Sequence, residues 1–366
     1  MTLLLNNSEV QQVLTPQMAM QALRLAYRQL IDGEAVCRPR IDIRIPTATP
    51  GRFYQWGSME GGSTAGYFAI RMKSDVVYEQ EYNGVRTNEK FAGVPGRFCG
   101  LILLTSIETA EPLALINDGY LQHLRVAADA AIGADLLARP GPVALGMLGS
   151  GGMARAHVEA LMAVRDIASI KVYSPTAANR RAFAIEMAAR FDLPVSAVDD
   201  PHDAYRGVDI LAACTDSSVP VIRGEWLEPG MHVISVGGQP DAAARARFDL
   251  SLCFGQSPAP VGRPELGTSD EYLGYLARPE DPTWSGVRFG RAAPARISGG
   301  AQVMLADIVA GRAGGRSDAR QITYAERGNI QGAQFHAVAG AAYDAARRRG
   351  IGRELPTEWF LQDIRD

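Results

Sequence analysis

Residues 143–154 read Val143-Ala144-Leu145-Gly146-Met147-Leu148-Gly149-Ser150-Gly151-Gly152-Met153-Ala154. A short apolar run leads into a glycine turn, and an alanine-rich segment of helical periodicity follows. The first glycine permits a tight turn, the second lets the backbone approach a pyrophosphate, and Ala154 is small enough for close helix–strand packing. The stretch therefore predicts a Rossmann unit that binds NAD or NADP through Gly149, Ser150, Gly151, Gly152 and Met153. A glycine turn that binds nothing is the alternative.

Downstream of this turn, short apolar segments alternate with a segment of helical periodicity. We expect strands at 170–173, 195–198, 209–214 and 232–236, and a helix at 177–191. Such alternation predicts a parallel sheet with right-handed crossovers. Thr215 and Val236, which lie at the ends of two of these strands, are further candidate cofactor contacts.

Upstream of the turn the pattern changes. β-rich runs separated by Gly- and Pro-containing loops between about 40 and 117 predict an antiparallel sheet built from hairpins. The polar, glycine-dotted stretch 79–100 is expected to be a long loop. A helix is predicted at about 119–138, and the tail from about 302 is predicted to be helical again.

The end of the second Rossmann strand bears on the choice of cofactor. NAD-preferring sites usually carry Asp or Glu there, to bind the ribose 2′-hydroxyl, but this chain has Ser174. Thr176, Arg180 and Arg181 follow, and hydroxyl groups with nearby arginines suit a 2′-phosphate. NADP is therefore favoured over NAD through Ser174, Thr176 and Arg180. The alternative is that the arginines belong to the solvated face of a helix.

The composition excludes several classes of protein. The 366 residues carry a net charge of −3, which does not favour a nucleic-acid partner. No apolar run approaches the length of a membrane helix, and the N-terminus lacks the features of a signal peptide. The four cysteines form no CxxC pair and are expected to be reduced thiols in a cytoplasmic protein. The five histidines show no metal-binding spacing, so no metal site is expected.

Several further motifs, taken together, resemble the ornithine cyclodeaminase/μ-crystallin family, which includes alanine dehydrogenases and ketimine reductases. The motifs are Pro39-Arg40-Ile41-Asp42, Glu111-Pro112-Leu113-Ala114, Leu124-Arg125-Val126-Ala127-Ala128, the glycine turn, Gly224-Glu225-Trp226-Leu227-Glu228-Pro229-Gly230, Val236-Gly237-Gly238 and Gly315-Arg316-Ser317-Asp318-Ala319-Arg320-Gln321-Ile322-Thr323. The resemblance implies an α/β protein in which a Rossmann domain is inserted into an α+β substrate-binding and dimerisation domain. We expect 1–125 plus 318–366 to form the latter, 126–317 to form the Rossmann domain, and two copies to form a homodimer.

The resemblance also implies roles for four basic residues. Arg40 and Arg125 match the two arginines that hold a substrate α-carboxylate, for which paired guanidinium groups are chemically suited. The family places a lysine near the cofactor ring, and Arg71 aligns with it. Lys73 lies two residues on and would point to the same face of a strand. Arginine cannot move a proton near neutral pH, so either Lys73 or water takes that role, or the chemistry differs.

Two further departures from the family pattern bear on the chemistry, and the first of them argues against a cyclodeaminase. The aspartate that follows the Val-Gly-Gly motif in cyclodeaminases is Gln239 here, and a neutral amide cannot act as a base. Asp241 could replace that aspartate only if the loop turned its side chain toward the substrate. The usual acid near the C-terminus is also missing from 328–335.

These observations predict an NAD(P)-dependent oxidoreductase that acts on the CH–NH or C=N bond of a small amino or imino acid. Arg71 and Lys73 are the candidate catalytic residues, and Arg40 and Arg125 the candidate substrate-binding residues. A cyclodeaminase-type lyase that uses bound NAD is the main alternative. A non-enzymatic, NADP-dependent ligand-binding protein is the second.

Overall fold

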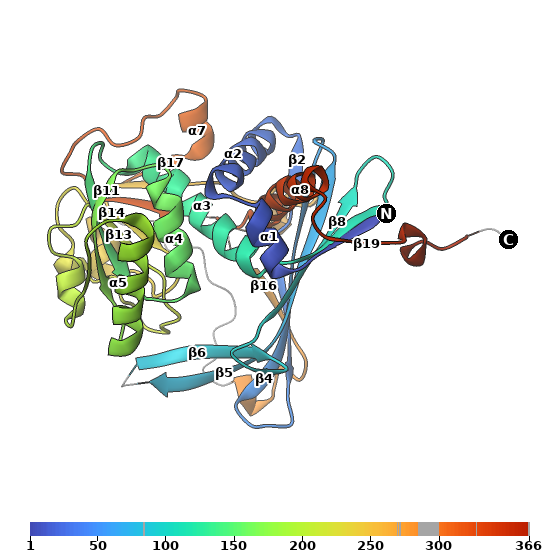
Figure 1. The fold of residues 1–366 in the computed structure, drawn as a ribbon, viewed down its shortest axis with the longest axis horizontal. Helices are drawn as coiled ribbons and strands as arrows, with labels where there is room; N and C mark the ends of the chain where they lie inside the picture. Colours follow the sequence, from blue (N-terminus) through green and yellow to red (C-terminus); the bar gives the residue numbers. More distant parts are fainter. Residues whose placement is uncertain (83–84, 269, 271, 285–299, 327, 365–366) are drawn as a thin grey trace.

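The computed structural model describes residues 1–82, 85–268, 270, 272–284, 300–326 and 328–364, and it contains two sheets with helices between them (Figure 1). Within the described residues, one sheet has eight strands, all paired in parallel. In spatial order these are β12 (Val195–Ala197), β11 (Ile167–Tyr173), β10 (Val143–Leu148), β13 (Ile210–Ala213), β14 (His232–Ser235), β18 (Thr323–Glu326), β15 (Leu250–Cys253) and β17 (Ala301–Met304). The helices that follow its strands are α4 (Gly152–Met162), α5 (Ala177–Phe191), α6 (Ala242–Arg247) and α7 (Leu305–Val309). The predicted parallel Rossmann sheet is confirmed.

The glycine turn connects β10 to α4, as the sequence predicts. Gly149 has a φ of +114°, and a Cβ there would lie 2.1 Å from the carbonyl oxygen of Cys214. Both the backbone conformation and the close approach of the next strand therefore require glycine. A Cβ on Gly151 would meet nothing within 4 Å, so the start of α4 is open.

The second sheet, here called the mixed sheet, has eleven strands in the described part of the chain. Its main path is β16 (Tyr272–Leu276), β3 (Arg40–Pro46), β4 (Arg52–Ser63), β5 (Tyr67–Tyr82), β8 (Cys99–Ser106), β9 (Pro112–Asn117), β1 (Thr2–Leu5) and β19 (Arg353–Leu355). Off this path, β2 (Ala35–Cys37) pairs with β4, β6 (Val85–Ala92) pairs with β5, and β7 (Val94–Pro95) pairs with β6. The pairs β1–β9 and β16–β3 are parallel and the others antiparallel.

The long loop predicted at 79–100 is wrong. β5 continues to Tyr82, and β6 returns beside it with Val76 to Tyr82 paired against Phe91 to Val85. The hairpin extends along the lower side of the Rossmann unit in Figure 1. Among the side chains of 76–81 and 86–92 none is fully buried, so the alternation of buried apolar and exposed polar residues that marks a strand in sequence is missing.

Two strands lie on the other side of the domain boundaries predicted from the sequence. β18 begins at Thr323, beyond the expected boundary at 317, yet it lies between β14 and β15 in the Rossmann sheet. β16 lies within 126–317, yet it pairs with β3 in the mixed sheet. The Rossmann unit therefore extends to about β18, and the segment after β15 contributes a strand to the other sheet before the chain returns to β17.

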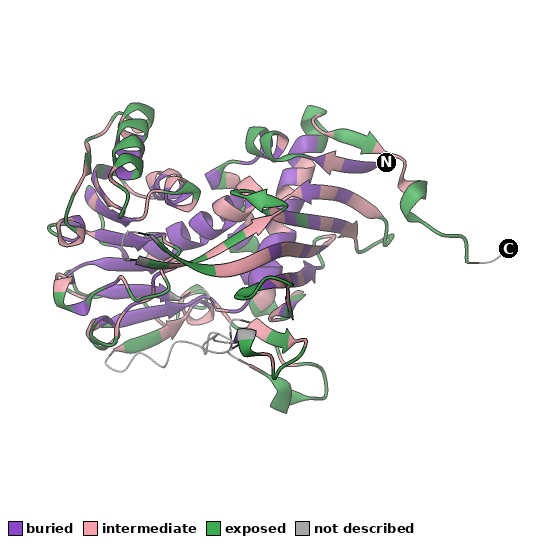
Figure 2. Cartoon of the chain, turned by 90° about the horizontal axis from the view of Figure 1, so that it is seen from below, coloured by how far each residue is buried: buried purple, intermediate pink, exposed green. Residues whose placement is uncertain are grey.

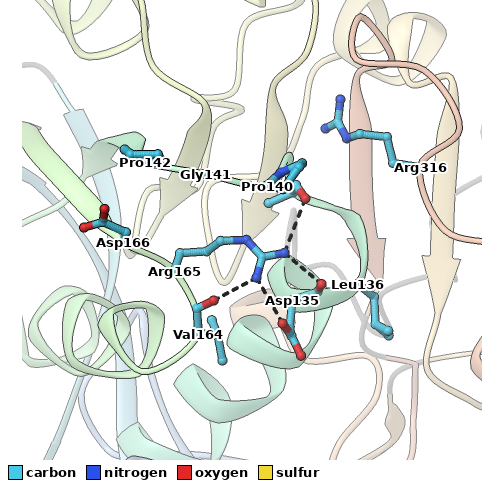
Figure 3. A pocket seen from close by; sticks show the side chains of 10 residues that line it. Asp135, Leu136, Pro140, Gly141, Pro142, Val164, Arg165, Asp166 and Arg316 are labelled. Carbon is cyan, nitrogen blue, oxygen red and sulfur yellow. Dashed lines mark hydrogen bonds and ion pairs between the residues drawn. The ribbon is translucent and has the colours of Figure 1, made fainter.

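Helices α1 (Asn7–Val13), α2 (Pro16–Asp32), α3 (Gly119–Leu137) and α8 (Gln331–Arg349) lie between the sheets (Figure 1). α3 runs from the mixed sheet to the Rossmann unit and ends against two arginines. Arg165 donates hydrogen bonds to the carbonyl oxygens of Ala134, Asp135 and Ala138, as Figure 3 shows in part. Arg316 donates to the carbonyl oxygen of Leu137 at 2.7 Å. These arginines line a surface hollow, but they are occupied in satisfying the carbonyl groups at the end of α3.

The two faces of the mixed sheet differ in burial. On β3, Asp42 and Arg44 lie on the inner face and are buried, whereas Ile43 and Ile45 lie on the other face and are 38% and 44% exposed. Figure 2 shows this alternation along the mixed sheet, while the Rossmann strands are mostly buried. The helices thus cover one face of the mixed sheet, and the outer face remains apolar and uncovered.

Candidate functional site

A cavity of about 410 Å³ lies where the mixed sheet, α3 and α8 meet the Rossmann unit. Seven candidate residues from the sequence line it together: Arg40, Arg71, Lys73, Arg125, Met153, Thr215 and Val236. The other candidates lie along the glycine turn and the β11–α5 connection: Gly149, Ser150, Gly151, Gly152, Ser174, Thr176 and Arg180. The groups expected to bind a substrate therefore face the groups expected to bind the cofactor.

Arg125 is held by a chain of buried polar side chains. It donates to the amide oxygen of Gln122, one turn earlier on α3, and to that of Gln334 on α8. Gln334 donates in turn to the hydroxyl of Tyr27 at 2.8 Å, and Tyr27 donates to Asp129. Burial and the Asp129 carboxylate raise the pKa of Tyr27 well above its usual value, so its proton stays in place. The network fixes the orientation of the Arg125 guanidinium.

Arg40 is fixed by a carboxylate on its own strand. Its Nε lies 2.7 Å from Oδ1 of Asp42 and its Nη2 lies 2.7 Å from Oδ2, so the pair is bidentate. Gln55 donates to the same carboxylate at 3.2 Å, and the guanidinium lies 5.2 Å from the ring centre of Tyr272 on β16. A further carboxylate would therefore meet an arginine whose position is already set.

Arg71 makes a comparable pair with Asp118. Its Nε lies 2.6 Å and its Nη2 2.5 Å from the same carboxylate oxygen. A Cβ on Gly100 would lie 1.9 Å from Asp118, so glycine on β8 makes room for that carboxylate. Arg71 is therefore held in one position by Asp118.

Lys73 lies on the same face of β5 as Arg71, as strand alternation predicts, and both line the cavity. Burial lowers its pKa well below the usual value of a lysine, and the positive charge of Arg40 lowers it further. The nearest carboxylate is that of Asp75, at 3.6 Å from Nζ. Of the two candidate catalytic residues, Lys73 is thus the one that gives up a proton more readily than an ordinary lysine.

His123, on α3, packs against the start of α4 at Gly152. A Cβ on Gly152 would lie 2.9 Å from its Cε1, so glycine at this position leaves room for the ring. Burial lowers the pKa of His123, which keeps the imidazole neutral near pH 7. The histidine therefore lies next to the glycine turn.

The candidate 2′-phosphate residues form a small cluster at the end of β11. The hydroxyls of Ser150 and Ser174 are 2.9 Å apart. Arg180 donates to the carbonyl oxygen of Ser174 at 2.9 Å and forms an ion pair with Asp199. Arg180 therefore stabilises the turn in this structure. Because the side chain of Asp199 is 82% exposed, it could exchange with an anionic ligand at little cost.

The loop after β14 does not bring the side chain of Asp241 into the cavity. Gly237 and Gly238 line the cavity, but Gln239 and Asp241 do not. Asp241 instead caps α6, accepting hydrogen bonds from the backbone of Ala244 at 2.7 Å and of Gly224 at 3.1 Å. Asp241 therefore does not replace the carboxylate that cyclodeaminases carry after this strand.

Sequence reasoning missed several residues that line the cavity: Gln55, Asn88, Lys90, Gln122, Tyr272 and Gln334. Gln122 lies three residues before Arg125 on one helix, a spacing that could have indicated the pair. Asn88 and Lys90 fell in the stretch predicted to be a loop. Tyr272 lies on β16, whose pairing with the distant β3 has no local signal.

The described part of the chain holds no group of three or more His, Cys, Asp or Glu side chains arranged to bind a metal. Among the same residues, no helix is both long enough and apolar enough to span a bilayer. All four cysteines are described and are free thiols.

Comparison with solved structures shows the fold. The chain covers 100% of the Δ1-pyrroline-2-carboxylate reductase of Thermococcus litoralis, solved with NADH and L-proline, at 23% identity and a TM-score of 0.73, with 97% of this chain aligned. An archaeal alanine dehydrogenase dimer with bound NAD aligns with 97% of this chain and 99% of its own, at 22% identity and a TM-score of 0.71. The predicted combination of a Rossmann unit with an α+β unit is confirmed.

Among sequence relatives, the Δ1-pyrroline-2-carboxylate reductase of Bacillus cereus is 27% identical over 256 residues, which are 70% of this chain and 74% of that protein. The chain spans only half the length of a Rhizobium meliloti relative to which it is 35% identical over 164 residues, 43% of this chain. The model of the ornithine cyclodeaminase/mu-crystallin family matches residues 48–249, more than half of the chain. This chain belongs to the ornithine cyclodeaminase/mu-crystallin family.

Proposed function

We propose that this protein is an NAD(P)-dependent oxidoreductase that reduces the C=N bond of a small imino acid or, in reverse, oxidises the corresponding amino acid. The observation that carries the proposal is the shared cavity, in which Arg40, Lys73 and Arg125 face Met153 and Thr215 of the Rossmann unit. The relatives named above as pyrroline-carboxylate reductases support the same class of reaction.

The residues present fit a dinucleotide. The turn from Gly149 to Gly152 has the required conformation, and the space around Gly151 at the start of α4 is open to a pyrophosphate. When bound, the nicotinamide supplies or accepts the hydride. We assign cofactor contacts to Met153, Thr215 and Val236 in the cavity, and to the glycine turn beyond it.

The remaining chemistry falls to the basic residues. Arg40 and Arg125 hold the α-carboxylate, which fixes the substrate carbon over the cofactor side of the cavity. Lys73 gives a proton to the substrate nitrogen in reduction and takes one in oxidation, a role favoured by its place in the cavity and by the burial that lowers its pKa. Arg71, which is paired with Asp118, forms part of the polar wall beside Lys73.

We infer a preference for NADP over NAD from the cluster at the end of β11. Ser150 and Ser174 offer hydroxyls, and no acid stands at the position that would bind a ribose 2′-hydroxyl. Arg180 would exchange its exposed partner Asp199 for a 2′-phosphate. Comparing kcat/KM for NADPH and NADH tests this preference.

The test of the proposed function is direct. Purified protein is mixed with NADPH or NADH and a panel of imines, including Δ1-pyrroline-2-carboxylate and 2-oxo acids with ammonium or methylamine, and cofactor oxidation is followed at 340 nm. We expect net oxidation with at least one imine and the formation of the matching amino acid. Tight ligand binding without cofactor oxidation across the panel would instead favour the ligand-binding alternative.

The lyase alternative is disfavoured because Gln239 stands at the aspartate position and Asp241 caps α6. Incubation with ornithine separates the two: a cyclodeaminase forms proline and ammonia with no net change in cofactor. We expect no proline under these conditions.

We also propose that two copies associate through the outer face of the mixed sheet. On this face, Ile43 on β3 and Leu101 on β8 are 38% and 37% exposed, and Met72 on β5, which is paired with Leu101, is partly exposed. Such an apolar, uncovered face favours association. Light scattering should give twice the chain mass of 39.3 kDa, and Leu101→Glu should give a monomer. A cytoplasmic location remains a prediction.

A further inference from the structure

The hairpin formed by β5 and β6 joins the mixed sheet to the Rossmann unit beside the cavity (Figure 1). Thr87 on β6 forms an isolated antiparallel bridge with Ser217, in the loop after β13. The backbone N–H of Ser218 donates to the carbonyl oxygen of Arg86 at 3.1 Å, and the Ser218 hydroxyl donates to the same oxygen. These contacts fix the position of β6 relative to both units.

This placement directs one face of β6 into the cavity. Asn88 and Lys90 are two residues apart, so their side chains share a face, and both line the cavity with Val77, which is paired with Lys90. On the opposite face of β6, the hydroxyl of Thr87 donates a hydrogen bond to the carboxylate of Glu89 at 2.8 Å. Asn88 and Lys90 are thus the side chains that the hairpin presents to a ligand.

The basic residues of the cavity differ in how their charge is balanced. Arg40 pairs with Asp42, Arg71 pairs with Asp118, and Lys73 lies 3.6 Å from Asp75.

Within the described residues, no ion pair involves Lys90, whose ammonium lies 5.4 Å from the ring centre of Phe98, and no hydrogen bond involves the side chain of Asn88. The positive charge of Lys90 also lowers the pKa of both Lys73 and His123, so its field reaches the cavity. An ammonium in no ion pair and an amide in no side-chain hydrogen bond leave several N–H donors available to an anionic group.

We propose that Asn88 and Lys90 bind a second acidic group of the substrate, so that the enzyme prefers 2-imino dicarboxylic acids over imino acids with an uncharged side chain. The inference rests on the proposed function. In this arrangement Arg40 and Arg125 hold the α-carboxylate, and the hairpin holds the distal carboxylate at another wall of the cavity. The substrate is then fixed at both ends, with its imine nitrogen left to Lys73.

The experiment compares two substrates of similar length, 2-oxoglutarate and 2-oxohexanoate, each with ammonium and with whichever cofactor the enzyme oxidises. We expect kcat/KM to be higher for 2-oxoglutarate in the natural protein. Lys90→Met should lower that value about 10- to 100-fold, the worth of one charge-assisted hydrogen bond, and leave 2-oxohexanoate unchanged. Lys90→Arg should retain most of the preference, and Glu89→Gln, on the opposite face of β6, is the matched control.

A binding measurement keeps the inference separate from the proposed function. Calorimetry of 2-oxoglutarate with the cofactor-loaded protein should show binding that weakens by the same factor in Lys90→Met. Binding without turnover would support the dicarboxylate site while contradicting the reductase. Equal kcat/KM for the two 2-oxo acids, equal losses for both in Lys90→Met, or a raised KM for the cofactor in that variant would each overturn the inference.

Discussion

Replacing Asp75 with asparagine should shift the pH dependence of the reaction, because Asp75 is the acid nearest to Lys73. The carboxylate lies 3.6 Å from Nζ and is buried, so solvent screens it little. Its negative charge raises the pKa of Lys73 against the opposing effects of burial and Arg40. An opposite charge at this distance changes a pKa by about 1–3 pH units. Since Asp42 also acts on Lys73 and remains, we expect the lower end, about 1 unit.

The sign of the shift follows from the role of Lys73. In reduction the protonated form acts, so kcat/KM falls as pH rises through the pKa of Lys73. In oxidation the neutral form acts, so kcat/KM rises through the same pKa. Removing the Asp75 charge lowers that pKa. Both limbs of the pH profile, the fall in kcat/KM for reduction and the rise for oxidation, should therefore move about 1 pH unit toward lower pH.

The assay is the pH profile of kcat/KM with one substrate, measured for the natural protein, Asp75→Asn and Asp75→Glu. Titration of the substrate itself is common to all three and cancels in the comparison. Asp75→Glu keeps the charge and should keep the limb near its original position. Lys73→Met should abolish the limb and lower kcat by about 10²–10⁴. An unmoved limb in Asp75→Asn, or an intact limb in Lys73→Met, would show that Lys73 does not move the proton.

Three further changes test other parts of the site. Arg125→Leu should lower kcat/KM at least about 100-fold, because it removes a fixed guanidinium from the α-carboxylate, while fluorescence titration should show unchanged cofactor binding; near-normal turnover would exclude the role. Gly149→Ala should abolish cofactor binding and lower Tm, since a Cβ would lie 2.1 Å from the Cys214 carbonyl oxygen and the backbone strain alone costs about 1–3 kcal/mol. Arg180→Leu should raise KM for NADPH more than KM for NADH; equal increases would indicate that Arg180 only stabilises the turn.

The parts of the fold predicted from the sequence are those with a local signal. The glycine turn at Gly149 and the alternation of buried strands with helices depend on neighbouring residues, and both predictions are confirmed. The β5–β6 hairpin was missed because its strands have no buried apolar face. The positions of β16 and β18 were missed because each pairs with strands far away in sequence.

In the site, too, features with a local sequence signal were predicted and features that depend on distant contacts were not. Alternation along one strand correctly placed Arg71 and Lys73 on a common face. It could not show that Arg71 pairs with Asp118, which lies 47 residues further on, and so could not choose between the two residues. The lowered pKa of Lys73 depends on burial and on Arg40, which become neighbours only in the folded chain.

The strand β16 limits how this protein can be divided. It leaves the Rossmann unit, covers the edge of β3, and places Tyr272 against Arg40. A shortened chain without the dinucleotide unit would lose β16, expose the hydrogen-bonding groups of β3, and present a free strand edge prone to aggregation. Exchanging the Rossmann unit for that of a relative would also exchange one wall of the substrate cavity, so cofactor choice and substrate choice cannot be engineered as independent modules.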